Sequence, residues 1–167
     1  MTAAIFGFFG FVWFGMAQEA PPGKWRPWLG IGSAVSILVA IGGGVLAWRH
    51  GDDGSAVDAE SGPIFGIVVA VEFILCGLGA AIVSKRGRKD LIVPWLAIVV
   101  GLHFVPLAWF FSFPVLGVMG VLMAAAGVAG VPVARSKGLA PSALVGVASG
   151  LLLWVTAVLS LVVALTW

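Results

Sequence analysis

The chain has 167 residues, of which 61% are hydrophobic and only 10% are charged. A soluble domain is typically about half apolar and a quarter charged, so this composition excludes a water-soluble globule. At about 20 residues per transmembrane helix, the length allows about six spans and no second domain. We therefore expect an all-α polytopic membrane helix bundle of six transmembrane helices, with residues 1–167 forming a single integral-membrane domain.

Six apolar runs predict the helices in chain order. They occur at about 2–17, 27–48, 63–84, 91–111, 114–134 and 142–167. Proline stands at or near the start of five of them, where a helix has no N–H partner to lose. The first run is short and interrupted by glycines, and no positive charge precedes it. We expect it to be retained rather than cleaved as a signal peptide, and whether it spans fully is left open.

The cations are unevenly distributed between the two sides of such a bundle. Alternating the six spans puts eight of the nine Lys and Arg residues on one side. They are Lys24, Arg26, Lys85, Arg86, Arg88, Lys89, Arg135 and Lys137. The positive-inside rule makes this side cytoplasmic and predicts that the N-terminus and the C-terminus both lie outside. The net charge of +2 then reflects membrane topology, and we expect the lipid bilayer, but no nucleic acid, as a partner.

Several kinds of chemistry lack the residues that they need. Cys76 is the only cysteine, which excludes an intrachain disulfide and a thiolate metal cluster. No phosphate-binding loop, His-Glu-x-x-His or Gly-x-Ser-x-Gly motif occurs in the sequence. The loop at 50–60 carries four carboxylates, but their spacing does not match an EF-hand, and we expect a solvated linker there. We expect no cofactor and no bound metal.

Glu72 and His103 are the ionisable residues that fall well inside the predicted spans. An ionised side chain at such a depth costs about 3 kcal/mol on insertion scales, so these residues usually serve a pathway or pair internally. Each lies about eight residues from the outer end of its helix, which places both about 12 Å deep. Because the two helices are consecutive and antiparallel, we expect the side chains to meet. Histidine changes charge near neutral pH, so the pair is the candidate proton or substrate site.

Residues near this pair are candidates for the lining of a pocket. Pro106, one turn after His103, cannot donate to the carbonyl of Leu102, so it kinks the helix and frees an acceptor. Cys76 lies one turn from Glu72 on the same helix face. The other candidates are aromatic and hydroxyl side chains: Phe73, Trp154, Ser36, Thr156 and Ser160.

A stripe of small residues recurs every four positions in the second predicted helix. It consists of Gly32, Ser36, Ala40 and Gly44. Such stripes let another helix backbone approach closely in a membrane. Packing within the bundle and the interface of a homo-oligomer both remain open as interpretations of this stripe.

Residues 100–108 read Val-Gly-Leu-His-Phe-Val-Pro-Leu-Ala. This stretch, about one helix long, resembles a segment in small multi-pass bacterial membrane proteins of unknown function. The resemblance implies a protein of the bacterial plasma membrane in which His103 and Pro106 belong to the shared segment. It implies no activity.

Three functional hypotheses remain open at this point. The first is a small transporter or channel-like protein with a protonatable site at Glu72 and His103. The second is an integral-membrane enzyme in which Glu72 acts as an acid on an apolar isoprenoid or lipid substrate. Its substrate would be held by aromatic side chains: Trp109, Phe104, Phe73 and Trp154. The third is a non-catalytic partner or sensor that docks on another membrane protein through its stripes of small residues. As a structural alternative to any of these functions, Glu72 and His103 would only clasp two helices together.

Overall fold

The computed structural model describes residues 2–49 and 62–166. These residues form six α-helices: α1 (Thr2–Ala17), α2 (Arg26–Arg49), α3 (Gly62–Lys85), α4 (Ile92–Phe110), α5 (Pro114–Ser136) and α6 (Pro141–Thr166). Two short 3-10 turns, η1 (Gly23–Trp25) and η3 (Lys89–Leu91), precede α2 and α4. No β-strand occurs within these two ranges. The all-helical bundle is confirmed, while the predicted acidic loop at 50–60 lies outside the described residues.

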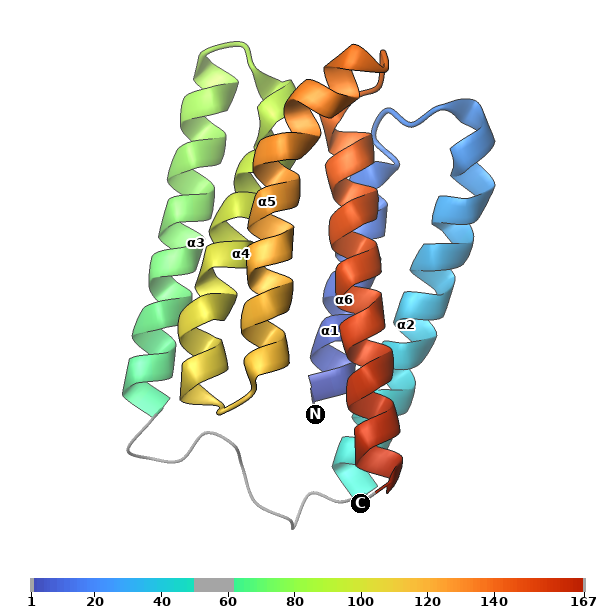
Figure 1. Cartoon of the computed structure of the whole chain (residues 1–167), viewed down its shortest axis with the longest axis vertical. Coiled ribbons are helices and arrows are strands. Elements are labelled where there is room, and N and C mark those ends of the chain that lie inside the picture. Colours follow the sequence, from blue (N-terminus) through green and yellow to red (C-terminus); the bar gives the residue numbers. More distant parts are fainter. Residues whose placement is uncertain (1, 50–61, 167) are drawn as a thin grey trace.

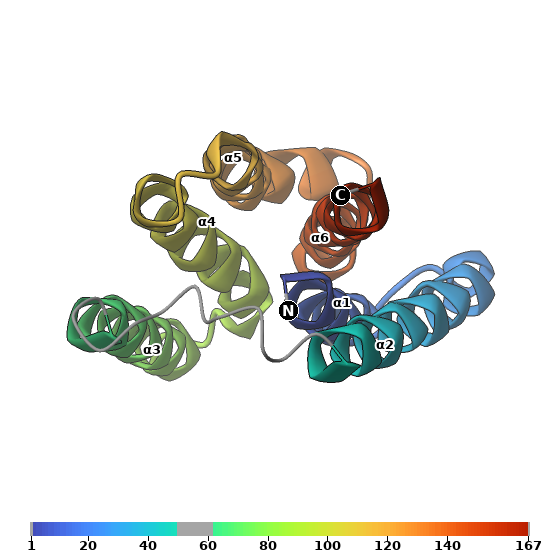
Figure 2. The same ribbon diagram turned by 90° about the horizontal axis from the view of Figure 1, so that it is seen from below.

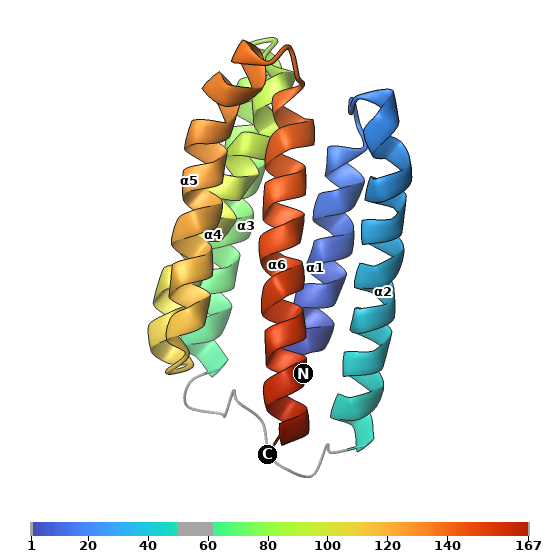
Figure 3. The same ribbon diagram turned by 45° about the vertical axis from the view of Figure 1, so that its right-hand side comes forward.

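Successive helices run in opposite directions, so both chain ends lie at the same end of the bundle (Figure 1). The connections α1–α2, α3–α4 and α5–α6, which with the adjoining helix ends carry all the Lys and Arg residues except Arg49, lie at the opposite end. Seen from below, α4 lies between α3 and α5, and α1 lies between α2 and α6 (Figure 2). The closest packing joins α4 to α5 and α1 to both α2 and α6 (Figure 3). By contrast, α3 packs mainly against α4 and lies at the edge of the bundle.

Five helices of the described chain are long and apolar enough to cross a membrane, which is compatible with a multi-pass membrane protein. The exception is α1, whose 16 residues extend about 24 Å, against a hydrocarbon core of about 30 Å. Its side chains Phe6, Trp13 and Phe14 are buried in the bundle. Part of the apolar character of α1 therefore serves packing inside the protein.

The small-residue stripe of α2 is used mainly within the chain. Gly32, Ser36 and Ala40 all face α1. The approach is so close that a Cβ atom added at Gly7 of α1 would lie 2.6 Å from the backbone nitrogen of Ala40. Gly44 has open space around it, and its neighbour Gly43 makes the close approach to α1 instead. Most of the stripe thus follows the first of the two interpretations, packing within the bundle.

Candidate functional site

Glu72 of α3 and His103 of α4 lie side by side, as predicted from their equal depth on consecutive antiparallel helices. The His103 Nε2 atom lies 3.4 Å from Glu72 Oε2, and the side chains are only 8% and 17% exposed, respectively. The imidazole is also within hydrogen-bonding reach of the Val68 backbone carbonyl, one turn before Glu72. The separation of 3.4 Å is longer than the roughly 2.8 Å of a tight charge-assisted hydrogen bond. The predicted contact is therefore present, in a geometry that a small movement can tighten or break.

The pair lines a groove of about 440 Å³ between α3 and α4. The lining residues are Ile67, Val68, Val71, Glu72, Leu75, Trp95, Ile98, Val99, Leu102, His103 and Pro106. Glu72 and His103 are the ionisable members of this set, and most of the others are aliphatic. Pro106 has no N–H, so it cannot donate the usual helical hydrogen bond to the carbonyl of Leu102. The groove thus combines a carboxyl, an imidazole and a carbonyl without its i+4 donor in an apolar wall.

Toward the basic end of the bundle, Trp95 connects α4 to α3. Its Nε1 donates a hydrogen bond of 2.9 Å to the backbone carbonyl of Leu75. The indole lies directly over Gly79, and any Cβ atom at that position would overlap it. Gly79 is accordingly the one buried residue among those described in α3. The pairing of Trp95 with a glycine on α3 could not be predicted from the sequence pattern.

Toward the other end, three phenylalanines close the space between the same two helices. Phe65 of α3 packs against Phe110 and Phe111, with ring centroids 6.4 and 6.0 Å apart. The two latter rings pack edge to face on each other. The Glu72–His103 pair therefore lies between two aromatic contacts along the helix axes. The sequence pattern did not predict a role for these three residues.

The remaining candidate liners are distributed differently. Pro106 lines the groove, but Cys76 and Phe73 do not, and Phe73 is 68% exposed. Ser36 and Thr156 are buried on α2 and α6, and the Thr156 hydroxyl donates to the Leu152 carbonyl of its own helix at 2.9 Å. Trp154 and Ser160 also lie on α6 and do not line the groove. The structure does not bring these residues to the pair because α2 and α6 pack around α1, whereas α3 packs against α4.

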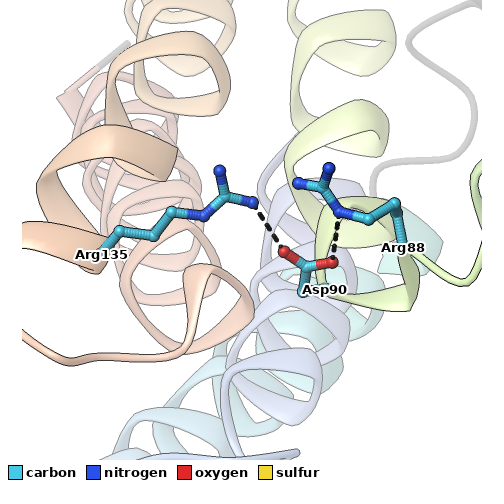
Figure 4. Close-up of polar contacts among 3 residues, drawn as sticks. All are labelled: Arg88, Asp90 and Arg135. Atoms are coloured by element: carbon cyan, nitrogen blue, oxygen red, sulfur yellow. Dashed lines mark hydrogen bonds and ion pairs between the residues drawn. The ribbon is translucent and has the colours of Figure 1, made fainter.

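Two arginines surround Asp90 at the basic end of the bundle (Figure 4). Arg135 Nη2 donates to Asp90 Oδ2 at 2.9 Å, and Arg88 Nε donates to Oδ1 at 3.4 Å. The hydrogen bond from Arg135 is the largest influence on Asp90 and lowers the pKa of this carboxyl below its ordinary value. The cluster ties the α3–α4 connection to the end of α5, and its exposure keeps the stabilisation small.

No group of three or more His, Cys, Asp or Glu residues that could hold a metal ion is found in the described part of the chain. Comparisons with family models, curated proteins and solved structures gave no match.

Proposed function

We propose that this chain is a small integral-membrane transporter or channel-like protein with Glu72 and His103 as its protonatable site. The observation that carries the proposal is their contact at 3.4 Å inside a groove with an otherwise largely apolar lining. A purely structural clasp can be built from Ser or Asn side chains, which gain about 1 kcal/mol in a membrane without the cost of burying an ionisable group. A carboxyl beside an imidazole adds the ability to take up and pass on a proton.

The proposed working arrangement has six spans, α1 included, with the basic end in the cytoplasm and both termini outside. Eight cations at the end opposite the two termini support this orientation. We also propose the bacterial plasma membrane as the location, on the resemblance of residues 100–108. Single cysteines introduced by Ser55→Cys and Ser136→Cys, in a Cys76→Ala background, test the topology. An impermeant thiol reagent applied to intact cells should label position 55 and leave position 136 unlabelled, and equal labelling contradicts the arrangement.

In this proposal the two aromatic contacts act as closures on either side of the protonatable pair. Phe65 with Phe110 and Phe111 separates the pair from one end of the bundle, and Trp95 over Gly79 separates it from the other. Opening the two closures in turn would expose the pair alternately, which is the geometric requirement of alternating access. Pro106, in the interior of α4, supplies a point at which that helix can bend.

The enzyme hypothesis is less well supported, because its aromatic residues do not gather around Glu72. Phe73 and Trp109 are 68% and 87% exposed, and Trp154 lies on α6. Phe104 packs against His103 and Phe6, with its ring in the core of the bundle. A carbocation held near Glu72 would therefore lack the cage of ring faces that the hypothesis needs.

Purified protein in liposomes that contain a pH-sensitive dye tests the transport proposal. Glu72→Gln and His103→Ala should each reduce proton flux driven by an imposed pH gradient by about tenfold or more. Phe73→Leu is the matched control, because this neighbour of Glu72 lies outside the groove and should leave the flux unchanged. If the two site variants keep the full flux while their thermal stability falls, the pair is only a clasp.

A further inference from the structure

The groove that contains Glu72 and His103 opens sideways, at the surface of the bundle. Three residues that line it, Ile67, Val71 and Leu102, are 64%, 49% and 57% exposed, respectively. Helix α3 forms one wall and lies at the edge of the bundle with α4 as its main neighbour (Figure 2). In a bilayer this exposed apolar surface faces hydrocarbon. The groove is therefore accessible from the membrane interior.

Access along the helix axes is obstructed at both ends. Trp95 lies over Gly79 on one side of the pair, and Phe65 packs with Phe110 and Phe111 on the other. A molecule that reaches the pair in this conformation must enter between α3 and α4 from the lipid. It must therefore dissolve in the bilayer.

The polar groups of the groove and their depth limit the charge and the hydrogen-bonding groups that the head of such a molecule can carry. His103 lies seven residues from the end of α4 at Phe110, which is about 10 Å along the helix. A permanently charged head is costly at this depth, so the head is uncharged. The Glu72 carboxyl and the Leu102 carbonyl offer acceptors and the imidazole offers a donor or an acceptor, a combination that suits a hydroxyl.

The walls restrict the rest of the molecule. On α3 the lining runs from Ile67 to Leu75, which is about 12 Å, and on α4 it continues from Trp95 to Pro106. Apart from the pair and the Leu102 carbonyl, these walls present mainly aliphatic and aromatic carbon. They run along the helices, and so parallel to the lipid tails. A long apolar tail fits this surface.

We propose that the groove binds a long-chain alcohol from the membrane, with its hydroxyl at Glu72, His103 and the Leu102 carbonyl and its tail along α3 and α4. The proposal rests on the Glu72–His103 site proposed above and names the class of molecule that this site takes. A straight-chain alcohol and a branched isoprenoid alcohol share this chemistry.

Photolabelling tests the proposal with the full chain in phosphatidylcholine vesicles. The probes are a straight-chain and an isoprenoid alcohol, each with a diazirine in its tail, and the labelled positions are mapped by mass spectrometry. We expect label concentrated at 67–75 and 98–106, and the probe that labels more strongly identifies the source of the ligand. Label spread evenly over the lipid-facing surfaces of α2 and α3 overturns the proposal.

Variants that fill the groove provide the second part of the test. Val71→Trp on one wall and Leu102→Trp on the other should each reduce groove labelling about tenfold by overpacking. Ile74→Trp is the control, because this exposed α3 residue does not line the groove. Undiminished labelling in both groove variants, with unfolding temperatures like that of the control, rejects the site.

A competition experiment distinguishes the contribution of the hydroxyl to binding from that of the tail. The unlabelled alcohol should compete about tenfold better than its methyl ether, which cannot donate a hydrogen bond. Equal competition rejects the alcohol class. Specific groove labelling with proton flux unchanged in the Glu72 and His103 variants would retain the binding site and reject the transport function. Proton flux that depends on Glu72 and His103, without labelling of the groove, would retain the transport function and reject the alcohol-binding site.

Discussion

Replacing Gly79 with alanine tests whether Trp95 holds α3 against α4 in the membrane. A Cβ atom at position 79 would overlap the Trp95 indole, so the ring must move. Overpacking of this kind costs about 1–3 kcal/mol. Loss of the 2.9 Å hydrogen bond from Trp95 to the Leu75 carbonyl adds about 1 kcal/mol. Alanine recovers about 1 kcal/mol of helix propensity, so we expect a net loss of about 2 kcal/mol.

Gly77→Ala is the matched control, since nothing lies within 4 Å of a Cβ at that position. It should leave stability unchanged or raise it by up to about 1 kcal/mol. Thermal unfolding of both variants in detergent gives the comparison. The rate at which a membrane-permeant maleimide labels the half-buried Cys76 reports loosening of α3 and should rise only in Gly79→Ala. Equal stability and equal labelling of the two variants would contradict the packing of the Trp95 indole on Gly79.

Three further predictions concern contacts elsewhere in the bundle. A double-mutant cycle with Glu72→Gln and His103→Ala should give a coupling of about 0.5–2 kcal/mol by denaturant unfolding, and additive losses would contradict direct contact. Asp90→Asn should cost under about 1 kcal/mol at neutral pH. Because the pKa of Asp90 is lowered in the folded protein, its stabilisation is present above the ordinary carboxyl range and lost as the pH falls through the lowered value. Unfolding measured against pH should therefore show a smaller acid-side decrease in Asp90→Asn than in the parent. Gly43→Ala should destabilise α1–α2 packing by about 1–3 kcal/mol, whereas the adjacent Gly44→Ala should be neutral, and a melting-temperature difference between the two checks this.

The helical class, the approximate helix bounds and the similar positions of Glu72 and His103 along their helices follow from the amino-acid sequence. Long apolar runs bounded by proline and charge leave few alternatives, because a backbone in lipid must satisfy its hydrogen bonds within the segment. The predicted starts of all six helices agree with the structure to within one residue. Equal depth on consecutive antiparallel helices also predicted the contact between Glu72 and His103, which the structure contains.

The face with which each helix meets its neighbours is a result of tertiary packing. Phe73 follows Glu72 directly, yet it is exposed and does not line the groove. Ser36 lies against α1, and Thr156 is buried on α6, which packs against α1 and not against α3. Trp95 and Gly79 became partners through a register that neither residue specifies alone. In a soluble helix an apolar stripe identifies the buried face, but these helices are apolar all round. Lipid and protein interior are similarly apolar, so close packing and local steric fit, rather than hydrophobic periodicity, select the contacts.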